Sequence, residues 1–383
     1  MSDFKESQND SLIEGLIPSS FYTVIKQERI FIGLIGLSFF VAGVVFPYAE
    51  IAMWVGFIFA GYSAIANDSI QTIGTFLASN QDKKWWHLWL YIGGIFLVVV
   101  TISFIIFDGD VSYQRLTSKG FNESPTSFTF LQVAAPIFLL ILTRMRMPVS
   151  TTFLLLSCFA TDAGSITSVL GKSLSGYFLA FAAGLITWIL VTKALEKRFS
   201  KSKAASFWLP VQWITSGTLW GVWVMQDAAN VAVYLPRSLE LGQFLGFALF
   251  IFFGLGVLFY LRGDKIQQIV TEKSRVTDIR SATIIDFIYA ILLTYKLTVS
   301  TVPMSTTWVF LGLLAGREVG MSIIDMINKD KSEGEHMGKP MGKVAKMIFK
   351  DLSYALFGLL VSILLAISIN ADVRAELLNY IGY

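Results

Sequence analysis

The sequence predicts an all-α integral membrane protein of about eleven transmembrane helices, arranged as a 5 + 5 inverted repeat with helices broken at mid-membrane. Three observations support this fold class. Hydrophobic residues make up 54% of the chain and charged residues only 15%, unlike soluble globular proteins. Several apolar stretches reach the roughly 20 residues that a helical crossing needs. A pair of polar cassettes also occurs twice, at nearly constant spacing.

The apolar stretches give the predicted crossings in chain order. One crossing, Ile30–Tyr48, precedes the repeats. The first unit is expected to cross at Ile51–Ser79, Leu88–Phe107, Phe128–Thr143, a span after Pro148, and Ser173–Ala194. The second is expected to cross at Phe207–Pro236, Leu239–Leu261, Thr283–Lys296, a span after Pro303, and Leu352–Ile369. The predicted organisation is a cytoplasmic tail (1–29), an extra transmembrane helix (30–50), repeat one (51–195), a cytoplasmic linker (196–206), repeat two (207–371) and a C-terminal tail (372–383).

Two of these spans are longer than a simple crossing requires. Ile51–Ser79 and Phe207–Pro236 each run to about 30 residues, and each contains polar residues. Irregular backbone at membrane depth is tolerated where it is buried in protein or lines a watery cavity. We therefore expect each span to consist of two half-helices with an unwound or bent middle.

The distribution of charge predicts the orientation. Loops rich in Lys and Arg are expected on the cytoplasmic side, which places the N-terminus and the basic segment Lys329–Lys350 inside. The segment Asp108–Ser127, with three acids against two basic residues, is then outside. Its counterpart in the second unit, Arg262–Arg280, is basic and falls inside, as an inverted repeat requires. The predicted location is the inner, cytoplasmic membrane.

The first duplicated cassette places a carboxylate beside amides within a predicted crossing. Asp227 lies 159 positions after Asp68. Each Asp has one amide directly before it and a second amide at i+3. Residues i and i+3 share a helix face, so the side-chain oxygens converge. Such oxygens suit Na⁺, or the Asp carries a proton; the alternative is that the amides join helices and the Asp pairs with a buried cation. The candidate cation-coupling residues are Asn67, Asp68, Gln71, Gln226, Asp227 and Asn230.

The second cassette reads Pro-x-Ser-Thr-Thr and predicts a helix start. Pro suits the first helical turn, and Ser or Thr suits the cap. A helix N-terminus buried in the membrane offers free N–H groups and a positive dipole end, which favour an anion. The alternative is an ordinary cap at the membrane surface. The candidate anion-binding residues are Ser150, Thr151, Thr152, Ser305, Thr306 and Thr307, with Ser305 following Ser150 by 155 positions.

Other charged residues within or near the predicted crossings receive weaker assignments. Asp162 and Arg317 occupy corresponding positions of the two units and could pair or gate, although the adjacent Glu318 could neutralise Arg317. Arg237 and Lys296 are expected to extend to the membrane surface, and direct anion contact is the alternative for each.

Composition excludes several classes of site. One cysteine and two histidines leave almost no material for a metal centre or a Ser-His-Asp triad. A net charge of +3 is small and says nothing about nucleic acid, which is not among the expected partners. We therefore expect no enzyme, no resident metal beyond Na⁺ bound at the two Asp residues, and no cofactor other than Na⁺ or H⁺ as the coupling ion.

The motifs resemble those of the PiT family of inorganic phosphate transporters (phosphate/sulfate permeases). Residues 67–75 resemble the family's GANDVANAxGT motif, residues 226–230 resemble its second copy, and both Pro-x-Ser-Thr-Thr segments match its P-[IV]-S-T-T segments. The resemblance spans roughly residues 51–320. One amide of each cassette is Gln here, at 71 and 226, and the His that usually follows Ser-Thr-Thr is replaced by Phe153 and Trp308.

The resemblance implies Na⁺- or H⁺-coupled symport of phosphate. The alternatives are the same mechanism for sulfate or bicarbonate, or an anion channel or sensor that uses the same site. The expected partners are the oxyanion, the coupling ion and membrane lipid, and a homodimer is an open alternative.

Overall fold

The chain forms a bundle of helices. The computed structural model describes residues 19–80, 82–118, 120–145, 147, 149–199, 204–261, 279–327 and 339–381, and within them there is no strand. The long helices are α2 (Ser19–Val45), α3 (Ala49–Ser79), α4 (Trp85–Ile106), α5 (Phe130–Arg144), α6 (Ala163–Phe199), α7 (Trp208–Ala232), α8 (Leu241–Tyr260), α10 (Ile279–Val299), α11 (Thr306–Ile327), α12 (Met341–Ile369) and α13 (Ala371–Ile381). Short helical segments are η1 (Arg115–Thr117), η2 (Thr152–Leu156) and η3 (Ser157–Phe159).

Seven of the described helices are long and apolar enough to cross a membrane: α2, α3, α4, α6, α8, α10 and α12. These helices lie where the apolar stretches predict crossings, and the all-helical membrane fold class is confirmed. α5 is a shorter apolar helix, while α7 and α11 carry polar residues. The inverted orientation of the two units stays a prediction, whereas the total of eleven crossings includes one, after Pro148, that the structure does not show. The predicted tail is helical from Ser19 onward.

The two long spans are not pairs of half-helices, so that prediction is wrong. α3 runs without interruption through Asp68, and α7 runs without interruption through Asp227. The physical reason is that each carboxylate accepts from an amide of its own helix, so that no unwound turn is needed to supply this partner. The backbone therefore keeps its own hydrogen bonds, which is the cheaper arrangement at membrane depth.

The chain instead leaves the helical path close to the two Ser-Thr-Thr segments. Residues 149–150 are not helical, and neither are residues 300–305, which connect α10 to α11. The crossing expected after Pro148 is also wrong. Pro148 itself lies outside the described residues, and the helical turns that follow (η2 and η3) span only residues 152–159 before the chain turns into α6. Eight helical residues extend about 12 Å, too little to cross a bilayer.

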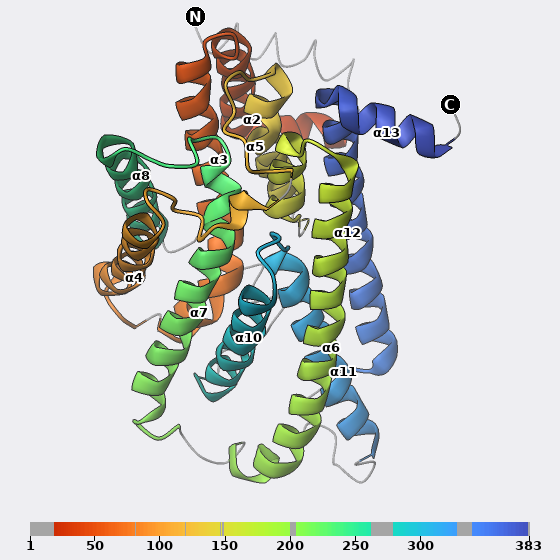
Figure 1. Cartoon of the computed structure of the whole chain (residues 1–383). Coiled ribbons are helices and arrows are strands. Elements are labelled where there is room, and N and C mark those ends of the chain that lie inside the picture. The colour runs from red at the N-terminus through yellow and green to blue at the C-terminus, as the bar shows by residue number, and fades with distance from the viewer. Residues whose placement is uncertain are drawn as a thin grey trace, which may run out of the picture.

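Equivalent helices of the two halves make equivalent contacts. α3 packs against α5 as α7 packs against α10, and α8 packs against α3 as α4 packs against α7. α6 packs against α11, and α12 packs against η2 and η3. Figure 1 shows α4 beside α8 at one side of the bundle and α6, α11 and α12 at the other, with α3, α7 and α10 between them. This arrangement directs the two polar cassettes toward one interior region.

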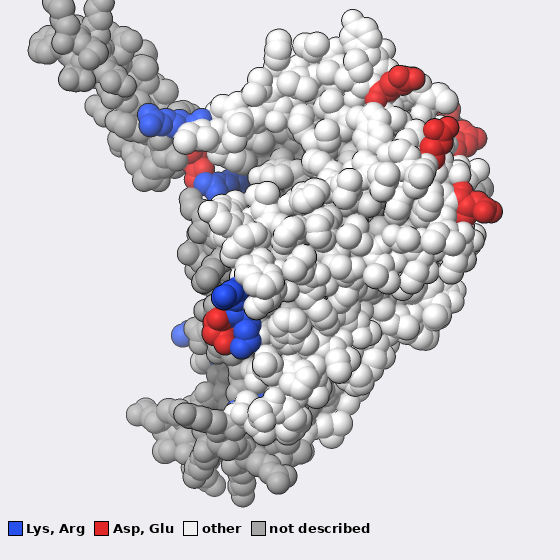
Figure 2. Space-filling view, turned by 90° about the vertical axis from the view of Figure 1, so that its left-hand side faces the viewer, with Lys and Arg blue, Asp and Glu red and all other residues white. Residues whose placement is uncertain are grey.

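The outer surface carries many large apolar side chains. Ile30 and Phe40 of α2 are 74% and 68% exposed, and Phe178, Ile214 and Phe253 are similarly exposed. Figure 2 shows a broad uncharged face between one edge with acidic side chains and an opposite edge where Lys and Arg lie together with acidic side chains. Exposure of this kind is unfavourable in water and expected in a hydrocarbon environment.

Glycines allow α6 and α11 to approach closely. A Cβ at Gly316 would collide with the backbone carbonyl of Phe181, and one at Gly312 would collide with that of Tyr177. A Cβ at Gly184, on the facing helix, would collide with the carbonyl of Leu313. Small residues at such contacts are typical of helix association in membranes. The contact fixes α11, whose first residues belong to the candidate site.

Candidate ion-binding site

The predicted site residues lie in the interior of the bundle. Ser305 is fully buried and Asp68 and Asp227 are 2% and 3% exposed. Eleven of the twelve candidates are at most 4% exposed: Asn67, Asp68, Ser150, Thr151, Thr152, Gln226, Asp227, Asn230, Ser305, Thr306 and Thr307. The side chain of the twelfth, Gln71, lies outside the described residues. Polar groups so deeply buried are costly unless partners or ligands satisfy them.

Asp68 is positioned by its neighbour on α3. The Nδ2 atom of Asn67 donates to Asp68 Oδ1 at 2.6 Å and to the carbonyl oxygen of Val149 at 3.2 Å. The second bond joins α3 to the non-helical segment that leads into Ser150. One amide therefore holds the carboxylate and the first Ser-Thr-Thr segment together.

Asp227 has the arrangement that its i+3 spacing predicts. Asn230 Nδ2 donates to Asp227 Oδ1 at 2.6 Å, within one turn of α7. Gln226 Nε2 donates to the carbonyl oxygen of Leu293 on α10 at 3.1 Å. The two amides of this cassette therefore have different roles. Asn230 orients the carboxylate, and Gln226 joins α7 to α10.

Thr152 connects the first hydroxyl segment to the second carboxylate. Its Oγ1 lies 3.5 Å from Asp227 Oδ1, donates to the carbonyl oxygen of Met304 at 3.3 Å, and accepts from Asn230 Nδ2 at 3.2 Å. Met304 directly precedes Ser305. The two halves of the chain therefore meet at one point, with both Ser-Thr-Thr segments against the Asp227 cassette.

Several buried oxygen atoms in this region have no hydrogen-bond partner within the part of the chain that the structure describes. They are Thr151 Oγ1, Gln226 Oε1, Asp227 Oδ2 and Asn230 Oδ1. Asp68 and Asp227 are also close enough for their charges to interact. Unsatisfied buried polar atoms are rare in native proteins, and carboxylate, amide and hydroxyl oxygens are ligands of hard cations. The donor set fits a small hard cation.

The serines of both segments cap the helical turns that follow them. Ser150 Oγ accepts from the backbone N–H of Phe153 at 3.2 Å, and Ser305 Oγ accepts from that of Trp308 at 3.2 Å. Capping uses the oxygen lone pair and leaves the rotatable O–H as a donor. The rings of Phe153 and Trp308 lie 5.2 Å apart, so the two segments face each other across this contact.

Sequence reasoning missed a third buried carboxylate. Asp286 of α10 accepts from Thr75 Oγ1 of α3 at 2.6 Å and from Ser216 Oγ of α7 at 2.5 Å. It is 1% exposed. An acidic residue inside the predicted crossing Thr283–Lys296 was the available signal. Both oxygens of Asp286 are satisfied by hydroxyls, which ties three central helices together.

The remaining charged residues have structural partners. Asp162 Oδ1 accepts from the backbone N–H of Ser165 at 2.7 Å at the start of α6 and does not pair with Arg317. Arg317 forms an ion pair with Glu318 at 2.8 Å, as the sequence suggested, and lies over the ring of Trp188.

Arg237 donates to four backbone carbonyls, those of Phe121, Glu123, Val233 and Leu235. Its guanidinium therefore does not extend free to the surface.

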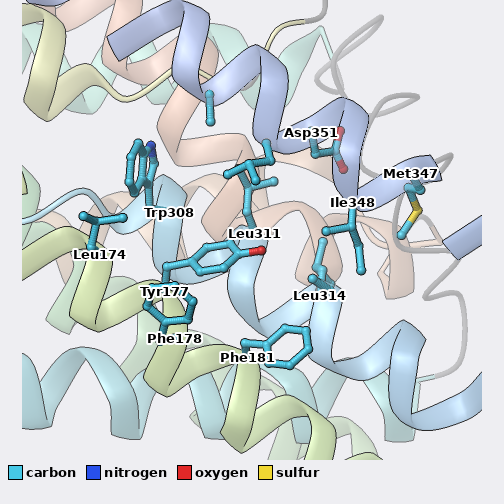
Figure 3. Close-up of a pocket in the computed structure, with 13 residues that line it drawn as sticks. Leu174, Tyr177, Phe178, Phe181, Trp308, Leu311, Leu314, Met347, Ile348 and Asp351 are labelled. Carbon is cyan, nitrogen blue, oxygen red and sulfur yellow. The ribbon is translucent and has the colours of Figure 1, made fainter. Parts of the chain in front are cut away.

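One sizeable cavity lies away from these oxygens. It has a volume of about 330 Å³ and lies between α6, α11 and α12, with an almost entirely apolar lining that Figure 3 shows around Tyr177, Trp308 and Leu311. An oxyanion would find few donors there. A smaller cavity of about 30 Å³ reaches Asp227, enough for a water molecule or a small ion.

The fold and its apolar helices define a multi-pass helical membrane protein with a buried polar centre. Among solved structures, the chain is similar to one described as "The sodium-dependent phosphate transporter", with a TM-score of 0.53 and 16% sequence identity. The match covers 86% of this chain and 99% of that one. The sequence matches no known protein-family profile and no curated protein. The fold implied by the motif resemblance is thereby confirmed.

Proposed function

We propose that the protein is a secondary active transporter that couples the uptake of inorganic phosphate to a cation gradient across the cytoplasmic membrane. The observation that carries the proposal is the contact of Thr152 with Asp227, which brings the two duplicated cassettes together around unpartnered buried oxygens. The likeness to the sodium-dependent phosphate transporter supports phosphate as substrate and favours Na⁺ over H⁺ as the coupling ion. No catalytic role and no cofactor beyond the coupling ion are needed.

In this proposal Asp68 and Asp227 hold the driving cations, with the amides of their cassettes. The anion binds between the two Ser-Thr-Thr segments, where hydroxyls and the N-terminus of α11 supply donors. Cation and anion charges offset each other in a dry site, so each ligand raises the affinity for the other. Alternating access then needs only that the occupied site be exposed to one side and then to the other.

A second oxyanion is the alternative substrate. The replacements at Gln71, Gln226, Phe153 and Trp308 change the reach and polarity of groups around the site. Trp308 has a buried indole Nε1 without a partner among the described residues, a donor that an oxyanion could use. Sulfate and bicarbonate are therefore the competitors to be compared with phosphate.

The deciding experiment is uptake into proteoliposomes with labelled phosphate, sulfate and bicarbonate, under imposed Na⁺ or H⁺ gradients. The proposal predicts saturable phosphate accumulation above equilibrium that needs the cation gradient. Phosphate flux that only follows its own gradient would indicate a channel, and preferential sulfate or bicarbonate accumulation would reassign the substrate.

A further inference from the structure

Three basic side chains converge on the segment that leads into the second Ser-Thr-Thr motif. Arg115 of η1 donates to the carbonyl oxygens of Leu297, at 2.9 Å, and Ser300. Lys172 of α6 donates to those of Ser300, at 2.8 Å, and Val302. Lys296, near the end of α10, donates to Ser175 Oγ at 2.7 Å. We call Arg115, Lys172 and Lys296 the basic cluster.

The basic cluster contains no acidic partner within the described residues. Each contact of the three side chains is to a neutral oxygen, and within the described residues none of them pairs with a carboxylate. Lys172 is close enough to Arg115 and to Lys296 for the charges to repel. Bringing like charges together in a partly dry region costs free energy unless an anion offsets it.

Donors remain unused in the cluster. The Nε atom of Arg115 is buried without a hydrogen-bond partner among the described residues, in a residue that is only 3% exposed. Lys172 uses two of its three ammonium donors, and Lys296 uses one. Capping of the carbonyls at the end of α10 explains the used donors. Capping does not explain why three basic side chains lie close together with no acidic partner among the described residues.

The cluster adjoins the candidate anion site. Ser173, the residue after Lys172, accepts from the backbone N–H of Ser305 at 2.9 Å. Val302, which Lys172 contacts, lies three positions before Ser305. Arg115 belongs to the segment between α4 and α5, which the charge distribution places outside the cell. An anion held by the cluster would therefore lie between the predicted outer surface and the start of α11.

We propose that the basic cluster is a second binding site for a phosphate-type oxyanion, on the outer side of the Ser-Thr-Thr segments. This inference rests on the proposed function, because the basic cluster would bind the transported anion before the anion reaches the buried site. Three basic side chains suit a divalent oxyanion, whose several oxygens can accept from two amino groups and a guanidinium at once. Bound phosphate would raise the local concentration of substrate at the start of α11.

A binding assay tests the cluster directly. Purified protein is treated with an amine-reactive reagent, with and without inorganic phosphate, and the modification of Lys172 and Lys296 is measured by mass spectrometry, with Lys83 as the internal reference. Phosphate should protect Lys296 and Lys172 but not Lys83, and chloride at equal ionic strength should protect none. Equal modification with and without phosphate would overturn the inference, whatever the transport activity.

Transport kinetics give the second test. Lys172→Gln and Lys296→Gln should each raise the KM for external phosphate about tenfold at low ionic strength, keep the maximal rate, and weaken the dependence of KM on salt. Lys296→Arg, which keeps the charge, should restore the wild-type KM, and Lys83→Gln should leave it unchanged. Wild-type KM and salt dependence in both Gln variants would contradict the inference, while wild-type protein without phosphate uptake would contradict the proposed function instead.

The head group of a lipid carries the same phosphate chemistry, so the reconstitution separates the two sources. Vesicles of zwitterionic lipid alone are compared with vesicles that contain phosphatidylglycerol. If free phosphate is the ligand, protection of Lys296 depends on phosphate concentration in both. Protection by phosphatidylglycerol without added phosphate would assign the cluster to lipid and overturn the proposal.

Discussion

Thr152 and Asp227, which come from different copies of the duplicated cassettes, lie in contact, with Thr152 Oγ1 3.5 Å from Asp227 Oδ1. The same hydroxyl accepts from Asn230 and donates to the carbonyl oxygen of Met304. One side chain therefore links the first hydroxyl segment, the second carboxylate and the residue before the second hydroxyl segment. Displacement of any of these three elements must change the environment of the other two.

Replacement of Thr152 by Val tests this link. Val keeps the volume and removes the hydroxyl, which leaves the Asn230 amide and the Met304 carbonyl each short of a partner. Such a loss costs about 1–3 kcal/mol, so we expect roughly a 5- to 100-fold fall in the apparent affinity for the coupling cation. The measurement is the cation dependence of phosphate uptake. The control is Thr143→Val, because the buried hydroxyl of Thr143 has no partner within the described residues. Equal behaviour of the two variants would exclude a special role for Thr152.

The sequence predicted which polar residues would be buried, but not which side chains would be their hydrogen-bond partners. The spacing of Asp227 and Asn230 predicted their contact because both lie on one turn of one helix. The contact of Thr152 with Asp227 joins distant segments, and only the packing of η2 against α7 determines it. Asp286 was missed because its hydroxyl partners, Thr75 and Ser216, come from two other helices.

The position of the backbone breaks was mispredicted for a related reason. Span length and polar content suggested unwinding at Asp68 and Asp227. An amide of the same helix donates to one oxygen of each carboxylate, so α3 and α7 stay continuous. The breaks occur near Ser150 and Ser305 instead, where a serine hydroxyl caps the turn that follows. A signal for helix initiation was visible in the sequence, whereas the tertiary partners of the carboxylates were not.

The orientation of the chain can be tested with single cysteines on a Cys158→Ser background. Asn122→Cys lies in the exposed segment between α4 and α5, and Asp82→Cys lies in the short turn between α3 and α4. A membrane-impermeant maleimide added to intact cells should label Asn122→Cys at once, and Asp82→Cys only after permeabilisation. The reverse pattern would contradict the predicted orientation.

The close contact of α6 with α11 predicts a stability effect at Gly316. A methyl group there would collide with the Phe181 carbonyl, and overpacking of this kind costs about 1–3 kcal/mol. Gly316→Ala should therefore lower the thermal unfolding midpoint of the detergent-solubilised protein. Gly36→Ala is the matched control, because a Cβ at Gly36 meets no other atom within 4 Å. An unchanged midpoint for Gly316→Ala would mean that the helices are less closely packed than described.

The observed capping role of Ser305 and its proposed role in anion binding can be separated. Ser305→Ala should cost about 1 kcal/mol of stability as a lost cap, whereas Ser305→Gly should cost only a few tenths of that. Both variants remove a donor to the anion, so both should lower phosphate affinity about 10- to 100-fold, or about 1.5–3 kcal/mol. Unfolding midpoints and uptake kinetics are measured together. If affinity instead follows stability across the two variants, the serine acts only as a cap.

The proposed coupling mechanism depends on the charges of Asp68 and Asp227. A carboxylate at this depth is costly unless a cation or proton shares its site, and Asp227 Oδ2 has no partner among the described residues. Asp68→Asn and Asp227→Asn keep the shape and remove the charge that attracts the cation. Each variant should reach the membrane but lose the dependence of phosphate uptake on the cation gradient. Phosphate affinity should fall as well, because the coupling of the two ligands is reciprocal.

Asp286→Asn is the matched control for this last experiment, since it also removes a buried carboxylate. Both oxygens of Asp286 already accept from hydroxyls, so its neutralisation should leave the cation dependence of uptake intact even where the rate falls. The informative quantity is therefore the ratio of uptake with and without the gradient, compared across the three variants at equal amounts of protein in the membrane. Wild-type ratios in Asp68→Asn and Asp227→Asn would show that the driving cation binds elsewhere. A ratio lost in all three would show that coupling needs the intact polar centre of the bundle, in which α10 takes part through Asp286.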